Sequence, residues 1–185
     1  MMTREEALVL LKENINSPNL LKHMYACEAI MQALARYFAE DEVKWGLAGL
    51  LHDIDYQKTQ DRKFAGHGSV GARMLEELGF PPDLTHAVEA HNSDTKVELE
   101  SLFDRCLYAT DPVSGLIVAG ALILPAKKLA VIDADFLYKR FYEKGFAKGA
   151  NREQIASCES FGFELRRFLA LALEAMQGIS AELGL

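Results

Sequence analysis

Residues 46–55 read GLAGLLHDID, a run of small and apolar residues that ends in a histidine and two aspartates. Ala48 and His52 lie four positions apart, so they share one face of a helix. Gly49 and Asp53 share the neighbouring face, where a glycine permits close contact with a second helix. His52 and Asp53 are about 100° apart around the axis, and at a helix end both can still reach one point. The stretch therefore predicts a closely packed helix that presents an imidazole and a carboxylate together.

Helical periodicity extends through most of the chain on both sides of this stretch, and strand-like alternation is scarce. Thr3 followed by Glu6 is typical of a capping box that opens a first helix. A polar loop is expected at about residues 55–66, and Pro112 predicts a kink in a long helix that begins near residue 99. The other expected helices cover about residues 20–38, 42–53, 67–78, 82–91, 133–143, 151–160 and 163–183. The fold class is therefore predicted to be all-α, a helical bundle.

The length of 185 residues and the hydrophobic content of 50% suffice for one domain with a sizeable core. We expect a single all-helical domain over residues 1–185. Its functional core is expected at about residues 18–120, with additional C-terminal helices over about residues 127–185. These last helices would serve as scaffold, as a wall for a substrate or as the face of an oligomer.

The formal net charge of −7 at pH 7 disfavours a nucleic-acid polymer or an acidic membrane as the main partner. A small phosphate ester remains compatible, because local positive charge or a metal ion can bind it. The longest apolar run, at about residues 116–126, is too short to span a bilayer. Three cysteines without a CxxC motif, and an N-terminus without a signal-peptide profile, predict a cytoplasmic protein with reduced thiols.

Six polar side chains fall on the apolar stripes of the expected helices, where a buried imidazole or carboxylate is costly unless it has a partner. They are His23, His52, Asp53, His67, His91 and Asp111. One such histidine alone is most often a satisfied core residue, but several groups that face inward by independent phasing favour a shared ligand. A metal ion held between helices would satisfy them together. His86 is the contrast, because it lies about 200° around its helix from Leu84 and is expected at the surface.

Imidazole and carboxylate ligands suit Fe, Mn, Zn, Co or Ni better than Mg or Ca, which prefer oxygen ligands. We expect one or two such divalent ions. A bound ion lowers the pKa of a water molecule and neutralises charge on a phosphoryl oxygen. Two ions about 3.5–4 Å apart would share a hydroxide, and a carboxylate with its two oxygens could bridge them. Asp53 is therefore the predicted bridging and catalytic residue.

Residues 49–55, GLLHDID, resemble the LLHDIG signature of the HD superfamily of metal-dependent phosphohydrolases. His23 matches the upstream histidine of that family and Asp111 its downstream aspartate, so the resemblance covers about residues 18–120. Residues 67–72, HGSVGA, resemble the HGxxGA segment of the HDIG subgroup. His91 resembles the histidine that ends the AIxxH helix of this subgroup. The resemblance implies an HD-domain helical bundle.

The HDIG subgroup also implies two metal ions. The first ion would be held by His23, His52, Asp53 and Asp111. The second would be held by Asp53, His67 and His91, with water or phosphate completing both shells. The chain departs from the pattern at Asp55, which replaces a glycine and would either orient a histidine or be merely solvated. It departs again at Asn92, where some two-metal relatives have a second histidine, and this weakens the expectation of a fully occupied second site.

Basic residues near these ligands are candidates for binding a substrate phosphate. Lys58, Arg62 and Lys63 lie in the polar loop between two ligand positions. Lys127 follows the long helix and could reach back toward the cleft. For each of these side chains the alternative is a solvated surface charge.

The pattern favours a phosphohydrolase that cleaves a small phosphate ester, with a nucleotide as the leading candidate. Both phosphomonoesterase and phosphodiesterase chemistry fit. One alternative is an oxygenase, because some HD-domain proteins with two irons cleave C–C or C–P bonds. The other is a non-catalytic regulatory module that a metal ion stabilises.

Overall fold

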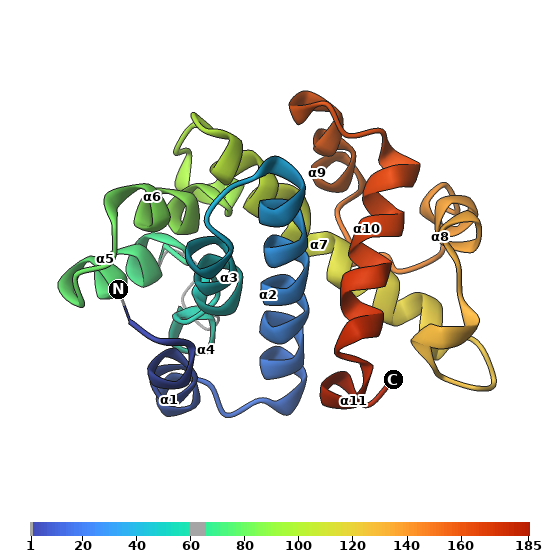
Figure 1. Cartoon of the computed structure of the whole chain (residues 1–185), viewed down its shortest axis with the longest axis horizontal. Helices are drawn as coiled ribbons and strands as arrows, with labels where there is room; N and C mark the ends of the chain where they lie inside the picture. Colours follow the sequence, from blue (N-terminus) through green and yellow to red (C-terminus); the bar gives the residue numbers. More distant parts are fainter. Residues whose placement is uncertain (1, 60–65) are drawn as a thin grey trace.

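The computed structural model describes residues 2–59 and 66–185, and every regular element in these ranges is a helix (Figure 1). The elements are α1 (Arg4–Asn14), α2 (Pro18–Phe38), α3 (Glu42–Leu51), α4 (Tyr56–Thr59), α5 (Ser69–Glu77), α6 (Pro82–Ala90), α7 (Leu102–Leu122), α8 (Ala134–Phe141), α9 (Arg152–Ala156), α10 (Leu165–Gly178) and α11 (Ser180–Leu183). Short 3₁₀ turns lie at η1 (Ser93–Thr95), η2 (Leu129–Val131) and η3 (Ser157–Phe161). The predicted all-α fold is confirmed.

Side-chain caps decide where several helices begin. The predicted capping box is present at α1, where the Thr3 hydroxyl accepts from the Glu6 N–H and the Glu6 carboxylate accepts from the Thr3 N–H. Ser17 caps α2 and is followed by Pro18, which is preorganised for the first helical position. Each such cap stabilises a helix by about 1 kcal/mol.

Helix α2 lies at the centre of the fold, in contact with α3, α7 and α10 (Figure 1). The approach of α2 to α3 is very close at Gly49, because a Cβ there would lie 2.6 Å from the carbonyl oxygen of Cys27. The expectation that a small residue permits a close helix contact is therefore confirmed. This contact places the end of α3 beside the first half of α2.

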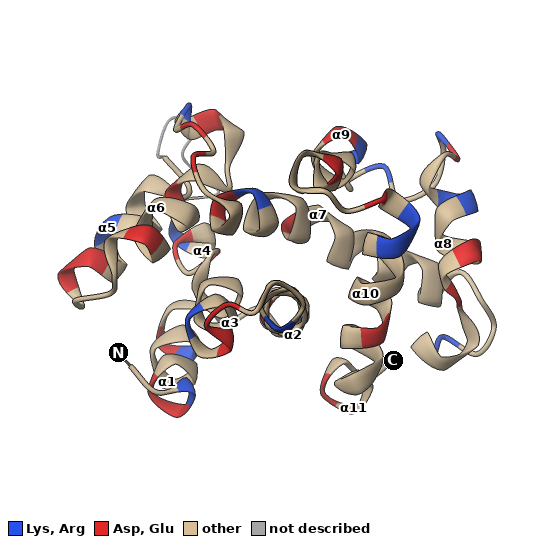
Figure 2. Cartoon of the chain, turned by 45° about the horizontal axis from the view of Figure 1, so that its top comes forward, with Lys and Arg blue, Asp and Glu red and all other residues tan. Residues whose placement is uncertain are grey.

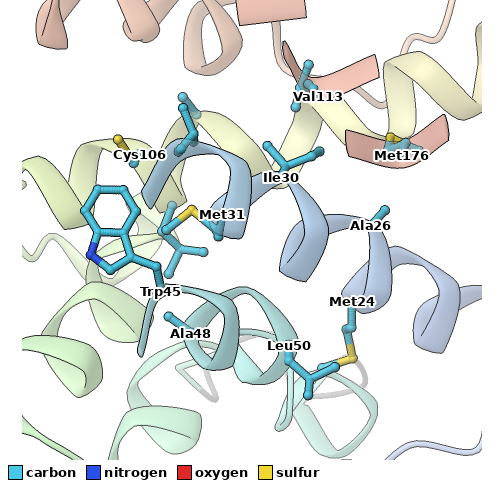
Figure 3. Packing of buried hydrophobic residues seen from close by; sticks show 14 of the residues in the cluster. Met24, Ala26, Ile30, Met31, Trp45, Ala48, Leu50, Cys106, Val113 and Met176 are labelled. Atoms are coloured by element: carbon cyan, nitrogen blue, oxygen red, sulfur yellow. The ribbon is translucent and has the colours of Figure 1, made fainter. Parts of the chain in front are cut away.

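The hydrophobic core surrounds α2. Figure 3 shows Met31 of α2 beside Trp45 of α3, and Ile30 of α2 near Val113 of α7. The Trp45 ring stacks on Phe103 at a centroid distance of 5.0 Å. Charged residues lie mostly on the outer helices, and the second half of α7 carries none (Figure 2). Among the helices of the described residues, none is both long enough and apolar enough to cross a membrane.

The structure corrects several expected boundaries. Residues 56–59 form the short helix α4 within the expected polar loop. Helix α7 begins at Leu102, three residues later than expected, because Ser101 and Asp104 form a capping box there. The expected last helix starts at Leu165 and is interrupted after Gly178, so that its end forms α11.

Candidate metal centre

Six side chains meet where the ends of several helices approach one another. His23 lies on α2, His52 and Asp53 directly after α3, His67 before α5, His91 directly after α6, and Asp111 on α7. These are the six residues predicted as metal ligands. The structure brings all of them into one cluster, as the distances between their nitrogen and oxygen atoms show.

The carboxylate of Asp53 lies in the middle of the cluster. Its Oδ1 atom is 2.9 Å from His67 Nε2, 3.4 Å from His91 Nε2 and 3.6 Å from His52 Nε2. Its Oδ2 atom is 3.6 Å from His23 Nε2. Asp53 therefore faces all four histidines. Among the described carboxylates of the cluster, it approaches His23 and His52 as well as His67 and His91.

The carboxylate of Asp111 faces one half of the cluster. Its Oδ1 atom is 3.3 Å from His23 Nε2 and 3.8 Å from His52 Nε2. The Nε2 atoms of His23 and His52 are 3.1 Å apart. His23, His52 and Asp111 thus form one group with Asp53, while His67 and His91 approach Asp53 from the other helices.

Backbone carbonyls fix the tautomers of two histidines. His52 Nδ1 lies 2.9 Å from the carbonyl oxygen of Gly49, and His91 Nδ1 lies 2.5 Å from that of Val88. A carbonyl oxygen only accepts hydrogen bonds, so each Nδ1 carries the proton and donates it. Each Nε2 is then the ring nitrogen that faces the centre of the cluster, where its lone pair can bind a proton or a metal ion.

The other two histidines are held in the same tautomer by side chains. His67 Nδ1 donates to Asp55 Oδ1 at 2.8 Å. His23 Nδ1 lies 2.8 Å from Ser114 Oγ, and Ser114 already uses its hydroxyl proton on the carbonyl of Asp111. Ser114 therefore accepts from His23. All four Nε2 lone pairs consequently point toward Asp53 and Asp111.

This convergence of Nε2 atoms and carboxylates provides a site that could hold a metal ion. His91 Nε2 is buried and has no hydrogen-bond partner among the described residues. The facing Nε2 atoms of His23 and His52 cannot bond each other while both are unprotonated. Ligand atoms about 2.0–2.2 Å from one ion lie roughly 3–4 Å from each other. The separations across this cluster match that spacing, so the donor set fits a metal ion.

The charges of the cluster shift the pKa values of its members. Burial opposes the charged form of His52, but Asp53 and Cys27 raise the pKa of this imidazole to about 9. Burial likewise opposes charge on His67, yet hydrogen bonds to Asp53 and Asp55 raise its pKa to about 10. The pKa of Asp53 is held well below its usual value against burial by the facing histidines. The cluster thus favours positive charge at its centre.

A family comparison matches this part of the chain. The model of the HD domain matches residues 20–134, which is more than half of the chain. The chain belongs to the HD domain family. Members of this family are generally metal-dependent phosphohydrolases, and the cluster of histidines and aspartates fits such a metal site. The resemblance read from the sequence is therefore confirmed.

Curated relatives share the same region. Ribonuclease Y of Oleidesulfovibrio alaskensis is 33% identical over 100 residues, which cover 54% of this chain and 18% of that protein. Ribonuclease Y of Nitratidesulfovibrio vulgaris is 34% identical over 102 residues, with the same two shares. An uncharacterized protein of Methanocaldococcus jannaschii is 37% identical over 95 residues, which cover 49% of this chain and 54% of the relative. The chain thus spans less than two thirds of each of these relatives. No solved structure matches.

The HD signature of this chain departs from the family pattern at Asp55, and the structure shows what this carboxylate contacts. Asp55 is fully buried and accepts hydrogen bonds from His67 Nδ1, from the Gly68 N–H at 3.0 Å and from the Gly71 N–H at 2.9 Å. Of the two alternatives for Asp55, the structure favours the partner of a histidine over the solvated side chain. Through these hydrogen bonds Asp55 connects the start of α5 to the segment that carries His52 and Asp53.

The metal centre, formed by these six side chains, opens into a cavity of about 400 Å³. Besides five of the six predicted ligands, the cavity is lined by Leu20, Tyr56, Asn92, Ser93 and Gln154. The Asn92 amide donates to the carbonyl of His67 at 2.9 Å, so it holds the turn of His67 against the end of α6. Among the described lining residues there is no lysine or arginine.

Of the basic residues predicted to bind phosphate, the two that the structure describes, Lys58 and Lys127, do not line this cavity. Lys58 lies on α4 and donates to Asn14 Oδ1 at 2.6 Å, because the turn of α4 directs it toward α1. Lys127 is exposed in the turn after α7 and does not line the cavity. Arg62 and Lys63 lie outside the described residues.

Sequence reasoning missed three neighbours of the metal centre. Ser114 and Gln154 were not singled out, and Cys27, read as an ordinary buried thiol, has its Sγ 3.8 Å from His23 Nδ1. The position of Cys27 one turn after His23 was the available signal. His86 lies outside the cluster as expected, but it is half-buried, with Nδ1 3.2 Å from Asp104 Oδ2.

Proposed function

We propose that this protein is a metal-dependent phosphohydrolase that cleaves a small phosphate ester, with a nucleotide as its substrate. The observation that carries the proposal is the common tautomer of four histidines, whose Nε2 lone pairs converge on Asp53 and Asp111. A cluster built only for packing would not need four imidazoles oriented in one way. Membership of the HD domain family supports the same activity.

The distances are compatible with the two ligand sets that the family resemblance implies. One ion would be held by His23, His52, Asp53 and Asp111, and a second by Asp53, His67 and His91. Divalent Fe, Mn, Zn, Co or Ni ions would supply a hydroxide near neutral pH and neutralise phosphoryl charge when bound. Asp53 would be the catalytic residue of the chain, because its two oxygens face both sets of histidines. The Nδ1 partners of the histidines would keep all four rings oriented through the reaction.

A small substrate is supported by the charges of the chain. The name ribonuclease Y indicates that these relatives act on RNA. Proteins that bind a nucleic-acid polymer neutralise its phosphates with lysine and arginine. This chain has a formal net charge of −7, and the described lining of its cavity contains no lysine or arginine. These features favour an ester with a single phosphoryl group near the ions over a polymer.

Metal analysis combined with phosphate release tests the proposal. The purified protein, supplied with Mn²⁺, would be assayed with a phosphomonoester, a phosphodiester, nucleoside monophosphates and a short RNA. Asp53→Ala is expected to lose metal and hydrolysis while the helical circular dichroism is kept. His86→Ala is the matched control, because His86 lies outside the cluster and should retain both.

Each alternative predicts a different result in these assays. A tightly bound mixed-valence di-iron centre, with no phosphate released from any ester, would replace the hydrolase with an oxygenase. Unchanged activities and ligand responses in a folded Asp53→Ala variant would favour a regulatory module. Cleavage of RNA in preference to every small ester would contradict the proposed substrate class.

A further inference from the structure

A second cavity, of about 300 Å³, adjoins the metal centre and shares His23 and Asp111 with the first. We call it the α7 chamber. Its other lining residues have no polar side-chain atoms, and they are Pro112, Gly115, Ala119, Ala147, Gly149 and Ala150. The metal centre therefore opens on one side into an apolar cavity, whereas the first cavity is polar.

One wall of the α7 chamber is a stripe along a helix. Asp111, Gly115 and Ala119 follow one another at four-residue spacing, so they lie on one face of α7. This stripe extends about 12 Å from Asp111. No charged residue follows Asp111 on α7, as the tan ribbon of its second half shows (Figure 2). A group that extends from the metal centre along this wall meets only small apolar side chains.

The opposite wall is the turn between α8 and α9, which a single arginine holds. Arg152 Nη1 donates to the carbonyls of Ala147 at 3.1 Å and Ala150 at 2.7 Å. Its Nη2 donates to the carbonyl of Phe146 and its Nε to that of Phe141. Each of these carbonyls accepts a hydrogen bond from Arg152, so one side chain fixes the course of this turn. The turn also lies beyond residue 134, where the HD family match ends.

Gly115 is not explained by the packing of the chain. A Cβ at this position would meet no described atom within 4 Å. By contrast, a Cβ at Gly120 on the same helix would lie 2.9 Å from Leu137, so that glycine is needed where α8 packs. Glycine inside a helix costs about 0.5–1 kcal/mol relative to alanine. Gly115 is exposed and lines the α7 chamber, so the open space at its Cβ lies at the mouth of the chamber.

We infer that the α7 chamber holds the organic group of the phosphate ester and that Gly115 sets its width. This inference rests on the proposed phosphohydrolase function. The group is uncharged and slim or flat, such as an aryl ring or the base of a nucleoside. Further phosphates are disfavoured, because the described lining of both cavities provides aspartates and no lysine or arginine.

Ligand binding to the Mn²⁺-loaded protein tests this inference without turnover. Calorimetry would compare inorganic phosphate, which needs only the metal centre, with phenylphosphonate, which carries an aryl group and is not hydrolysed. Gly115→Leu is expected to weaken phenylphosphonate binding at least tenfold and to change phosphate binding less than twofold. Gly115→Ala should weaken phenylphosphonate binding less than Gly115→Leu does. The alanine variant provides the test if the leucine variant does not fold.

Gly178→Leu is the matched control, because a Cβ at the end of α10 also meets no described atom within 4 Å and lies outside both cavities. It should leave both ligands unaffected. Unchanged phenylphosphonate binding in both Gly115 variants would overturn the inference while the proposed function stands. Equal loss of both ligands would also overturn it, because Gly115 would then act on the phosphate site. Failure of the wild-type protein to bind either ligand would overturn the function and the inference together.

Discussion

The side-chain amide of Gln154 donates to the carbonyl oxygen of Tyr108 at a distance of 2.8 Å. In a regular helix this carbonyl would accept from the N–H of residue 112, but Pro112 has no N–H. Gln154 therefore supplies the bond that the proline removes, one turn before Asp111. Helix α9, which lies beyond the HD family match, thus supports α7 at the metal centre.

Gln154→Ala is expected to destabilise the protein and to loosen its metal centre. Loss of the hydrogen bond to this partly buried carbonyl lowers the free energy of unfolding by about 1 kcal/mol. The proline-containing turn next to Asp111 would then be less restrained, so metal affinity should fall as well. Urea unfolding measures the first effect and metal titration the second.

Gln177→Ala provides the control, because Gln177 donates to the carbonyl of Leu129 at 2.9 Å, away from the metal centre. Both variants should lose stability, and only Gln154→Ala should lose metal affinity. Equal metal affinity in the two variants would show that Gln154 acts on the fold alone.

Asp55→Asn is expected to weaken the binding of metal by His67. The carboxylate accepts from His67 Nδ1 and from two backbone N–H groups, and an amide NH₂ would face one of those donors. Loss of such a partner behind a ligating histidine typically costs 10–100-fold in metal affinity. Isothermal titration with Mn²⁺ should therefore show one weakened site. Two sites of unchanged affinity would assign Asp55 to the local fold of α5 only.

Helical phasing indicated that these side chains face inward, and the resemblance to the HD family assigned them to one centre. His23 and Asp111 lie 88 positions apart, yet each falls on an apolar stripe that must face the core. The common tautomer was not predictable. It depends on carbonyls at Gly49 and Val88, whose direction follows from how the ends of α3 and α6 are oriented.

The contacts that the sequence did not reveal have a similar physical origin. Lys58 was a candidate for phosphate binding, with a solvated surface charge as the alternative, and the turn of α4 carries its ammonium group to Asn14. The roles of Gln154 and Arg152 depend on where the C-terminal helices pack on α7. Local periodicity indicates that such helices exist and which face is apolar, but it does not indicate which distant carbonyl a side chain reaches.

The stability of the fold is expected to fall at alkaline pH through its buried thiols. Burial, and secondarily Glu159, raise the pKa of Cys158 to about 12. In the unfolded chain a thiol has a pKa of about 8.5. The folded state therefore retains a proton that the unfolded state loses. The stabilisation is fully present below pH 8.5 and is lost as the pH rises toward 12.

Urea unfolding at pH 7, 9 and 10 measures this loss. Cys158→Ser removes the titrating thiol, so its free energy of unfolding should fall less steeply between pH 8.5 and 10 than that of the wild-type protein. If the free energy of unfolding falls equally steeply with pH in both proteins, groups other than Cys158 cause the loss of stability at alkaline pH.

Metal binding is expected to stabilise the fold, because only the folded chain gathers the four Nε2 lone pairs. A free metal concentration 100-fold above Kd should raise the free energy of unfolding by about 2.7 kcal/mol. Ser114→Ala removes the acceptor of His23 Nδ1, so the ring loses its fixed orientation. A tenfold weaker site at the same metal concentration would reduce the stabilisation to about 1.4 kcal/mol.

Urea unfolding with and without Mn²⁺ measures this increase in the free energy of unfolding, which is called the increment below. Ser157→Ala is the control, because the Ser157 hydroxyl also donates to a carbonyl three residues earlier but accepts from no histidine. It should keep the full increment, whereas Ser114→Ala should keep about half. Mg²⁺, which prefers oxygen ligands, should stabilise the wild-type protein less than Mn²⁺ does. Equal increments in the two serine variants would mean that the orientation of His23 does not depend on Ser114.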